Sequence, residues 1–297
     1  MRSFLFLALS SLATFVIGEP IPYPPQATSK PAIPANFHPT FGNKKGNFQP
    51  TTTKVGKYRF TERDTGGQVQ NPAVAVWSIN DEDGIGAGTD VYNMYTGDGS
   101  AGAGWPVRSQ WVSFTEMFNA NKVIMFSSCS TWNVDNDSGP EVGAIWNAIE
   151  AVAAETGVDH RFILATIIQE SGGCVRVPTT NYGVRNPGLM QDHNGSGTCN
   201  SDLTGEIDDP CPDATILQMV TDGTGGTPDG DGLAQCINES GLGDDADFYR
   251  AARLYNSGSI DDSGDLGAGI ATHCYSSDIA NRLTGWVTAP HGCSLDG

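Results

Sequence analysis

The sequence is poor in basic residues, and this shortage limits its partners. From Asp64 onward only eight lysines and arginines occur, whereas almost every acidic residue lies in that same part, and the formal net charge is −18. Proteins that bind nucleic acid need positive surface to neutralise phosphates. The composition therefore argues against a nucleic-acid partner.

A long apolar run is also missing after the first 18 residues. Residues 1–18 combine one arginine, a short apolar run and a small residue before Glu19, which is the pattern of a secretory signal peptide. No later stretch is apolar enough to cross a bilayer, which takes about 20 residues. We therefore expect a secreted, extracellular protein with no membrane partner.

No Cys-x-x-Cys pair occurs, which argues against a zinc ribbon. All seven cysteines follow residue 18, and in a secreted chain such cysteines form disulfides. Cys199 and Cys211 predict one short bridge, and Cys293 is the first candidate for the leftover thiol.

Asp81 and Asp83 match only part of a calcium-loop pattern, so we expect no metal and no cofactor. Asn-x-Ser sequons at Asn136, Asn194 and Asn238 predict a glycoprotein.

Composition divides the chain into four parts. Residues 1–18 are the signal peptide, and the proline-rich residues 19–53 have no apolar period, which predicts a disordered linker. Residues 54–129 hold short β-branched runs among glycine-rich turns and predict a β-rich extension, either a small subdomain or a lid. Residues 130–297 predict a mainly α (α+β) domain.

Two helices are predicted with clear ends. The first runs from Pro140 to Gly157, with an apolar stripe at helical spacing, proline at its first position and glycine at its end. The second begins after Asp159 as N-cap and stops at Gly172-Gly173. We expect the first to pack on the second. Shorter helices are predicted within 110–121, with Ser113 or Thr115 as cap, and at 213–220, 245–256 and 277–284, with a flexible loop at 222–232.

Glu170 falls in the last turn of that second helix. An apolar neighbourhood and the negative end of the helix dipole both raise the pKa of a carboxyl group there. A carboxylic acid still protonated near neutral pH can protonate a leaving glycosidic oxygen. A lone glutamate at a helix end is more often a solvated surface residue, so the rest of the motif decides its interpretation.

Glu170-Ser171 is followed by Gly188-Leu189-Met190-Gln191 and later by Leu254-Tyr255-Asn256. This order resembles the soluble lytic transglycosylase and goose-type lysozyme superfamily over roughly residues 140–286, with Leu254 where that family usually has alanine. The resemblance implies a disulfide-stabilised, lysozyme-like fold with Glu170 as general acid. The substrate-binding residues that it implies are Ser171, Tyr182, Met190, Gln191, Tyr255 and Asn256.

The second carboxylate decides the mechanism. Goose-type lysozymes position the attacking water with an aspartate that follows the Gly-Leu-Met-Gln loop. In this chain the candidate is Asp192, which lies one residue earlier than the family's aspartate. The alternative candidates are Asp202, Glu206 and Asp208. Lytic transglycosylases use no second carboxylate, because the substrate's own 6-hydroxyl attacks. A serine nucleophile is not supported, since no elbow motif surrounds Ser171.

The sequence thus predicts a monomeric, muramidase-like glycosidase that cleaves β-1,4 bonds in peptidoglycan. Anionic cell wall is repelled by an acidic protein, whereas neutral chitin and cationic chitosan are not. A chitinase or chitosanase-type hydrolase is therefore an alternative, and a lytic transglycosylase is another. The rival from a different class is a non-catalytic effector that binds cell-wall glycan.

Overall fold

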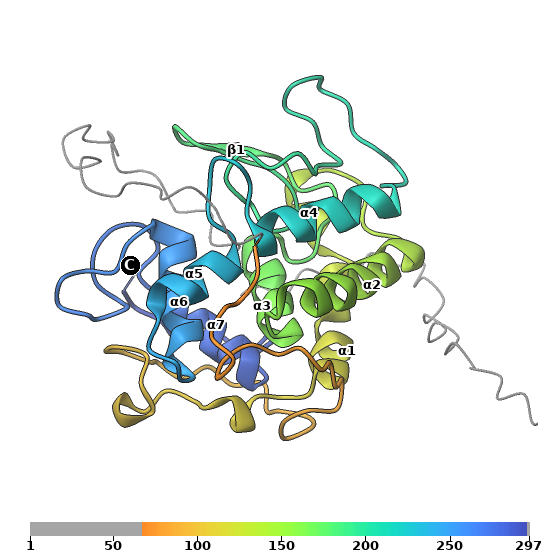
Figure 1. The fold of residues 1–297 in the computed structure, drawn as a ribbon. Coiled ribbons are helices and arrows are strands. Elements are labelled where there is room, and N and C mark those ends of the chain that lie inside the picture. Colours follow the sequence, from red (N-terminus) through yellow and green to blue (C-terminus); the bar gives the residue numbers. More distant parts are fainter. Residues whose placement is uncertain (1–66, 296–297) are drawn as a thin grey trace, which may run out of the picture.

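The structure, a computed structural model, describes residues 67–295. The predicted signal peptide, the linker and residues 54–66 lie outside this range. The described part is mainly helical, with seven α-helices and one two-stranded sheet (Figure 1). None of its helices has the length and apolar character that a membrane span requires.

The α-helices of the described part span the chain from Phe114 to Thr284. They are α1 (Phe114–Met125), α2 (Gly139–Thr156), α3 (His160–Ser171), α4 (Asp213–Gly225), α5 (Leu233–Ser240), α6 (Ala246–Ser257) and α7 (Tyr275–Thr284). Short 3-10 helices are η1 (Ala101–Ala103), η2 (Arg108–Gln110) and η3 (Ser128–Trp132). The antiparallel strands β1 (Thr180–Asn181) and β2 (Arg185–Asn186) form the sheet.

Helix α3 is the buried centre of the fold. Every one of its residues except Glu170 is buried, and it packs against α1, α2 and α7. Each fully buried leucine, isoleucine or phenylalanine stabilises the fold by roughly 1.5–3 kcal/mol. The helix therefore holds its last turn, and Glu170 with it, in a fixed position.

The ends of α2 and α3 confirm the capping signals. Ser138 caps α2 by accepting a hydrogen bond from the Glu141 amide, and Gly157 ends α2 in the left-handed conformation, with φ of 72°. Asp159 accepts from the Arg161 amide and caps α3, which ends at Gly172. Glycine suits both ends because a left-handed residue with a Cβ is disfavoured.

The β-rich extension predicted for residues 54–129 is wrong for the part that the structure describes, because residues 67–129 contain no strand. Instead of pairing with each other, Val69 and Val76 donate their amides to the carbonyls of Thr156 and Gly157 at the end of α2. In Figure 1 much of this segment follows the lower edge of the molecule. Its side chains Trp111 and Phe114 belong to the same core as α3.

Helix α1 also replaces a predicted strand. Ser113 caps it, as expected, by accepting a hydrogen bond from the Glu116 amide. The helix then continues to Met125 and takes in the apolar run that resembled a strand. Its buried residues recur at helical spacing: Phe114, Met117, Phe118, Asn121, Ile124 and Met125.

Three disulfides join loops to this helical core, at Cys129–Cys174, Cys199–Cys211 and Cys274–Cys293. The predicted Cys199–Cys211 bridge is confirmed. The prediction that Cys293 is the leftover thiol is wrong. The free cysteine is Cys236, which is buried on the apolar face of α5; α5 itself was not predicted.

The C-terminal helices lie close to their predicted positions, although α4 is longer. It continues to Gly225 and takes in the first part of the loop expected at residues 222–232. Asp222 explains the extension. Its carboxylate accepts hydrogen bonds from the amides of Ser196 and Gly197, so this residue faces the interior and does not belong to a solvated acidic loop.

Candidate functional site

Glu170 lies in the last turn of α3 and is the one residue of that helix still partly exposed. The Tyr275 hydroxyl donates a hydrogen bond to its Oε1 at 2.5 Å. Burial raises the pKa of Glu170 to about 7, although the Tyr275 hydrogen bond acts in the opposite direction. Near neutral pH this carboxyl group therefore holds a proton in a substantial part of the molecules.

Tyr275 is a site residue that the sequence did not indicate. It is the first residue of α7, it is 1% exposed, and it lies 105 positions from Glu170 along the chain. Burial and the charge of Glu170 raise its pKa well above the usual value. The phenol therefore stays protonated and donates its hydrogen bond to the Glu170 carboxylate.

Tyr255 holds the loop at residues 188–191. Its hydroxyl donates to the Met190 carbonyl at 2.8 Å. Burial, followed by the charges of Asp192 and Glu170, raises the pKa of Tyr255. The ring is thus within electrostatic reach of both carboxyl groups, and its hydroxyl fixes the loop backbone.

Gln191 holds the same loop in an uncommon conformation. Its backbone is left-handed, with φ of 47°, which costs a non-glycine residue about 1 kcal/mol. The side-chain amide donates to the Gly188 carbonyl at 3.0 Å, and its oxygen accepts from the Thr180 hydroxyl at 3.0 Å. Gln191 is partly exposed, so it both shapes the loop and borders solvent.

The other predicted substrate-binding residues are placed less favourably for contact with a sugar. Ser171 is buried, and its hydroxyl closes the helix end by donating to the Ile167 carbonyl. The Met190 side chain is fully buried against α4. Asn256 accepts from the Thr272 amide, and Tyr182 lies at the exposed tip of the β1–β2 hairpin.

Asp192 is placed unlike a catalytic base. It is 3% exposed, and its carboxyl oxygens make no hydrogen bond of good geometry among the described residues, although the Gly195 amide is close enough to act on its pKa. Burial, and then the charge of Asp222, raises its pKa to about 8. The group is therefore largely protonated at neutral pH, when a water-activating base must be ionised. Of the reserves, Asp202 is paired with Arg185 at 2.8 Å.

These raised pKa values predict that the protein is less stable at neutral pH than in mild acid. Glu170 and Asp192 keep protons in the folded state that the unfolded chain releases above about pH 4 to 5. Their stabilising contribution is complete below that range and is lost as the pH rises to 7 or 8. We expect the free energy of unfolding to fall by several kcal/mol between about pH 5 and pH 8, since each group contributes about 1.4 kcal/mol per pH unit while only its folded form keeps the proton.

Chemical denaturation at several pH values measures this slope. Asp192→Asn keeps the shape of the protonated side chain and cannot titrate, so this variant should lose part of the slope. Below about pH 4 stability should fall again, because the pKa of Asp159 is lowered by the Arg161 guanidinium and by His160 despite its burial. A free energy of unfolding that rises from pH 5 to pH 8 would contradict the pKa assignments.

Two cavities stand out elsewhere in the described part. One of about 300 Å³ lies between α1 and the end of α7, beside Glu116 and Arg282. The other, of about 220 Å³, lies beside Arg108 and Asp245. Glu170 lines neither of them. The candidate site is therefore described by the side chains around Glu170.

The chain matches no protein-family model, no curated protein and no solved structure. The likeness to the lytic transglycosylase and goose-type lysozyme superfamily therefore rests on the motif residues alone. Of these, the structure joins Tyr255 to the loop at residues 188–191 through its hydrogen bond to the Met190 carbonyl, and the charge of Glu170 acts on the pKa of Tyr255.

Proposed function

We propose that the protein is a secreted, muramidase-like glycosidase that cleaves β-1,4 bonds between amino sugars, with Glu170 as general acid. One observation carries this proposal. A partly exposed carboxyl group ends a buried helix, has a pKa of about 7 and accepts a hydrogen bond from Tyr275. A raised pKa of this kind suits a group that must deliver a proton.

The first step needs only Glu170 and its partner. As the glycosidic bond breaks, the proton of Glu170 passes to the leaving oxygen, and the carboxylate remains. The Tyr275 hydroxyl stabilises that carboxylate through its hydrogen bond. Tyr275 is thus a positioning residue for the acid, and it also makes the proton easier to release.

The environment of Asp192 favours a lytic transglycosylase as the second candidate within this class. An inverting hydrolase needs an ionised second carboxylate to activate water, and Asp192 is buried with a raised pKa. In the transglycosylase reaction the 6-hydroxyl of the substrate attacks the anomeric carbon. Its proton returns to the Glu170 carboxylate, and an anhydro sugar forms.

The substrate is the less defined part of the proposal. Peptidoglycan is the first choice because of the motif residues, and chitin or chitosan is the alternative because of the net charge of −18. The test is digestion of peptidoglycan, chitin and chitosan by the pure protein across acid and neutral pH, followed by mass analysis. Hydrolysis yields reducing ends, whereas transglycosylation yields ends that are one water lighter.

Saccharide binding without turnover of any of the three polymers would support the rival, a non-catalytic effector that binds cell-wall glycan. No cleavage and no binding would overturn both ideas.

Replacing Tyr275 by phenylalanine should move the pH dependence of cleavage. The Tyr275 hydrogen bond lowers the pKa of Glu170, so its loss raises that pKa further. The alkaline limb of the kcat/KM profile, which reports the acid of the free enzyme, should shift to higher pH. A profile measured from about pH 4 to pH 9 checks this, and an unchanged limb would show that Tyr275 does not act on Glu170.

A further inference from the structure

A second cluster of ionisable side chains lies at the opposite end of α3. It combines Asp81 from the loop before α1, Glu150 from α2 and His160, the first residue of α3. One ligand atom from each of the three lies within 4.8 Å of the other two. Glu170 is ten residues further along the helix, about 15 Å away at the ordinary helical rise. The cluster is therefore separate from the candidate acid.

His160 has no conventional partner in this cluster. It is 1% exposed, yet neither ring nitrogen makes a hydrogen bond of good geometry among the described residues, and the Asp159 carboxylate is close enough for the ring to lower its pKa. Its Nε2 is 3.6 Å from Asp81 Oδ1, and its Nδ1 is 3.4 Å from Asp159 Oδ1. Buried polar groups are almost always hydrogen-bonded, and exceptions call for an explanation such as an ion. One oxygen each of Asp81 and Glu150 is buried and likewise makes no hydrogen bond of good geometry among the described residues.

The charges of the cluster also lack compensation. Two carboxyl groups lie together beside a buried imidazole, and among the described residues no lysine or arginine forms an ion pair with either of them. Arg161, the next residue on α3, is paired to Asp159 at 2.6 Å. Without a cation the two carboxylates repel each other. A divalent cation would cancel their charge and accept the lone pair of the imidazole.

We propose that Asp81, Glu150 and His160 bind a zinc ion. One imidazole nitrogen and two carboxylate oxygens are ligands that zinc accepts, and a water completes a tetrahedral shell. Atoms bound to one tetrahedral zinc ion lie about 3.3 Å apart, given bonds of about 2.0–2.1 Å. The two carboxylates are partly exposed, so they can rotate inward by the small distance that binding needs.

Asp159 supplies the outer support that metal-binding histidines usually have. Its carboxylate is 3.4 Å from His160 Nδ1 and is held by Arg161 through Nε at 2.9 Å and Nη2 at 2.6 Å. A carboxylate behind the imidazole fixes the tautomer and leaves Nε2 for the metal. The ion would tie the loop around Asp81 to α2 and α3, which is a stabilising function and not a catalytic one.

The test uses the full mature chain, stripped with a chelator and then dialysed against zinc. We expect about one zinc ion per chain by metal analysis, and a thermal midpoint several degrees higher with zinc than with chelator. Glu150→Gln and Asp81→Asn should each weaken zinc binding at least tenfold. Glu155→Gln, an exposed carboxylate later on α2, is the matched control and should bind like the wild type.

Two further measurements keep the test decisive. The thermal midpoints of the variants in chelator show that they are folded, and calcium and magnesium in place of zinc should raise the midpoint less. If the wild type takes up no zinc, the proposal is wrong. It is equally wrong if the folded Glu150→Gln and Asp81→Asn variants bind zinc as tightly as the control does.

Discussion

Replacing Glu170 by glutamine is expected to lower the cleavage of amino-sugar polymers by about 10²–10⁴-fold, the contribution of a general acid, and to leave the fold intact. Glutamine has nearly the same shape as glutamic acid but has no proton to donate to the glycosidic oxygen. The Tyr275 hydroxyl can still donate to the amide oxygen, as it does to Glu170 Oε1. Initial rates on the best of the three polymers measure the loss.

The interpretation of this variant depends on folding and on a control. Removing a carboxyl group whose pKa is raised by burial should not destabilise the protein near neutral pH, so the thermal midpoint should be kept or slightly raised. Glu155→Gln makes the same substitution on an exposed surface of α2 and should retain full activity. An active, folded Glu170→Gln variant would remove Glu170 from the mechanism.

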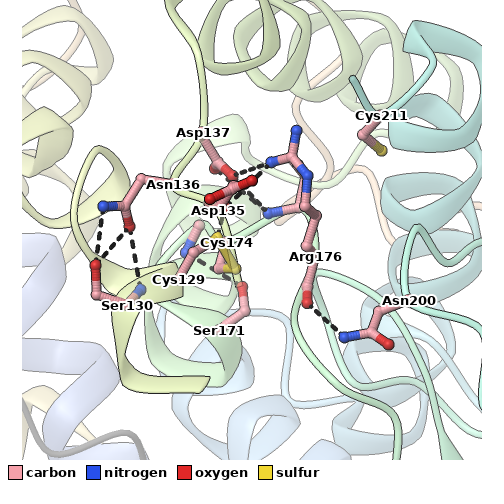
Figure 2. Close-up of a disulfide and its surroundings, with 12 residues drawn as sticks. Cys129, Ser130, Asp135, Asn136, Asp137, Ser171, Cys174, Arg176, Asn200 and Cys211 are labelled. Carbon is pink, nitrogen blue, oxygen red and sulfur yellow. Dashed lines mark hydrogen bonds and ion pairs between the residues drawn. A yellow bond between two sulfur atoms is a disulfide. The ribbon is translucent and has the colours of Figure 1, made fainter. Parts of the chain in front are cut away.

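The second large effect is expected from Arg176→Met, a loss of roughly 3–5 kcal/mol in the free energy of unfolding. Arg176 is 1% exposed, and its guanidinium contacts the carboxylates of Glu141 and Asp209. It also contacts the carboxylate of Asp137 (Figure 2). Glu141 also accepts the Cys211 amide at 2.7 Å. Without the arginine, Asp137 and Glu141 remain as buried carboxylates with no cation beside them.

This loss has consequences for the candidate site. Arg176 follows Cys174, whose disulfide to Cys129 joins the end of α3 to η3 (Figure 2). Breaking the ion network therefore loosens the segment that leaves the last turn of α3, where Glu170 lies. Arg185→Met is the matched control, because its pair with Asp202 is more exposed and should contribute at most about 1 kcal/mol. Equal denaturation midpoints for the two variants would contradict this account.

The parts of the fold that were predicted correctly depend on signals close together in the chain. Asp159 and Gly172 mark the ends of α3 through their own backbone and capping hydrogen bonds, and a sequence shows such signals directly. The raised pKa of Glu170 follows from its place on a helix whose other residues are all buried. Local patterns are sufficient for both conclusions.

The parts that were missed depend on contacts between distant segments. Tyr275 reaches Glu170 across 105 residues, and no pattern near either residue indicates the contact. The same holds for Cys293, which pairs with Cys274 because the chain after α7 turns back toward its start. Asp192 follows the motif loop directly and was therefore the candidate for the second catalytic carboxylate. It is buried near Asp222, which belongs to α4, and this contact between distant segments cannot be seen in the sequence.

The N-terminal extension was misjudged for a related reason. Its β-branched runs have the composition of strands, but they find no partner strand among the described residues. Val69 and Val76 donate hydrogen bonds to the last residues of α2 instead. Ser113 caps a helix that continues through the apolar residues up to Met125, so these residues are helical and not a strand. The cluster of Asp81, Glu150 and His160 likewise exists only after this segment is folded onto α2 and α3.

The most direct test of the central claim is a titration of the Glu170 carboxyl group itself. Glutamate labelled with ¹³C at the carboxyl carbon gives one NMR signal per residue, and the signal absent from Glu170→Gln is assigned to Glu170. We predict an apparent pKa of about 7 for that signal in the wild-type protein. A midpoint near 4.5, the usual value for glutamate, would mean that the group has lost its proton before neutral pH and cannot serve there as the acid.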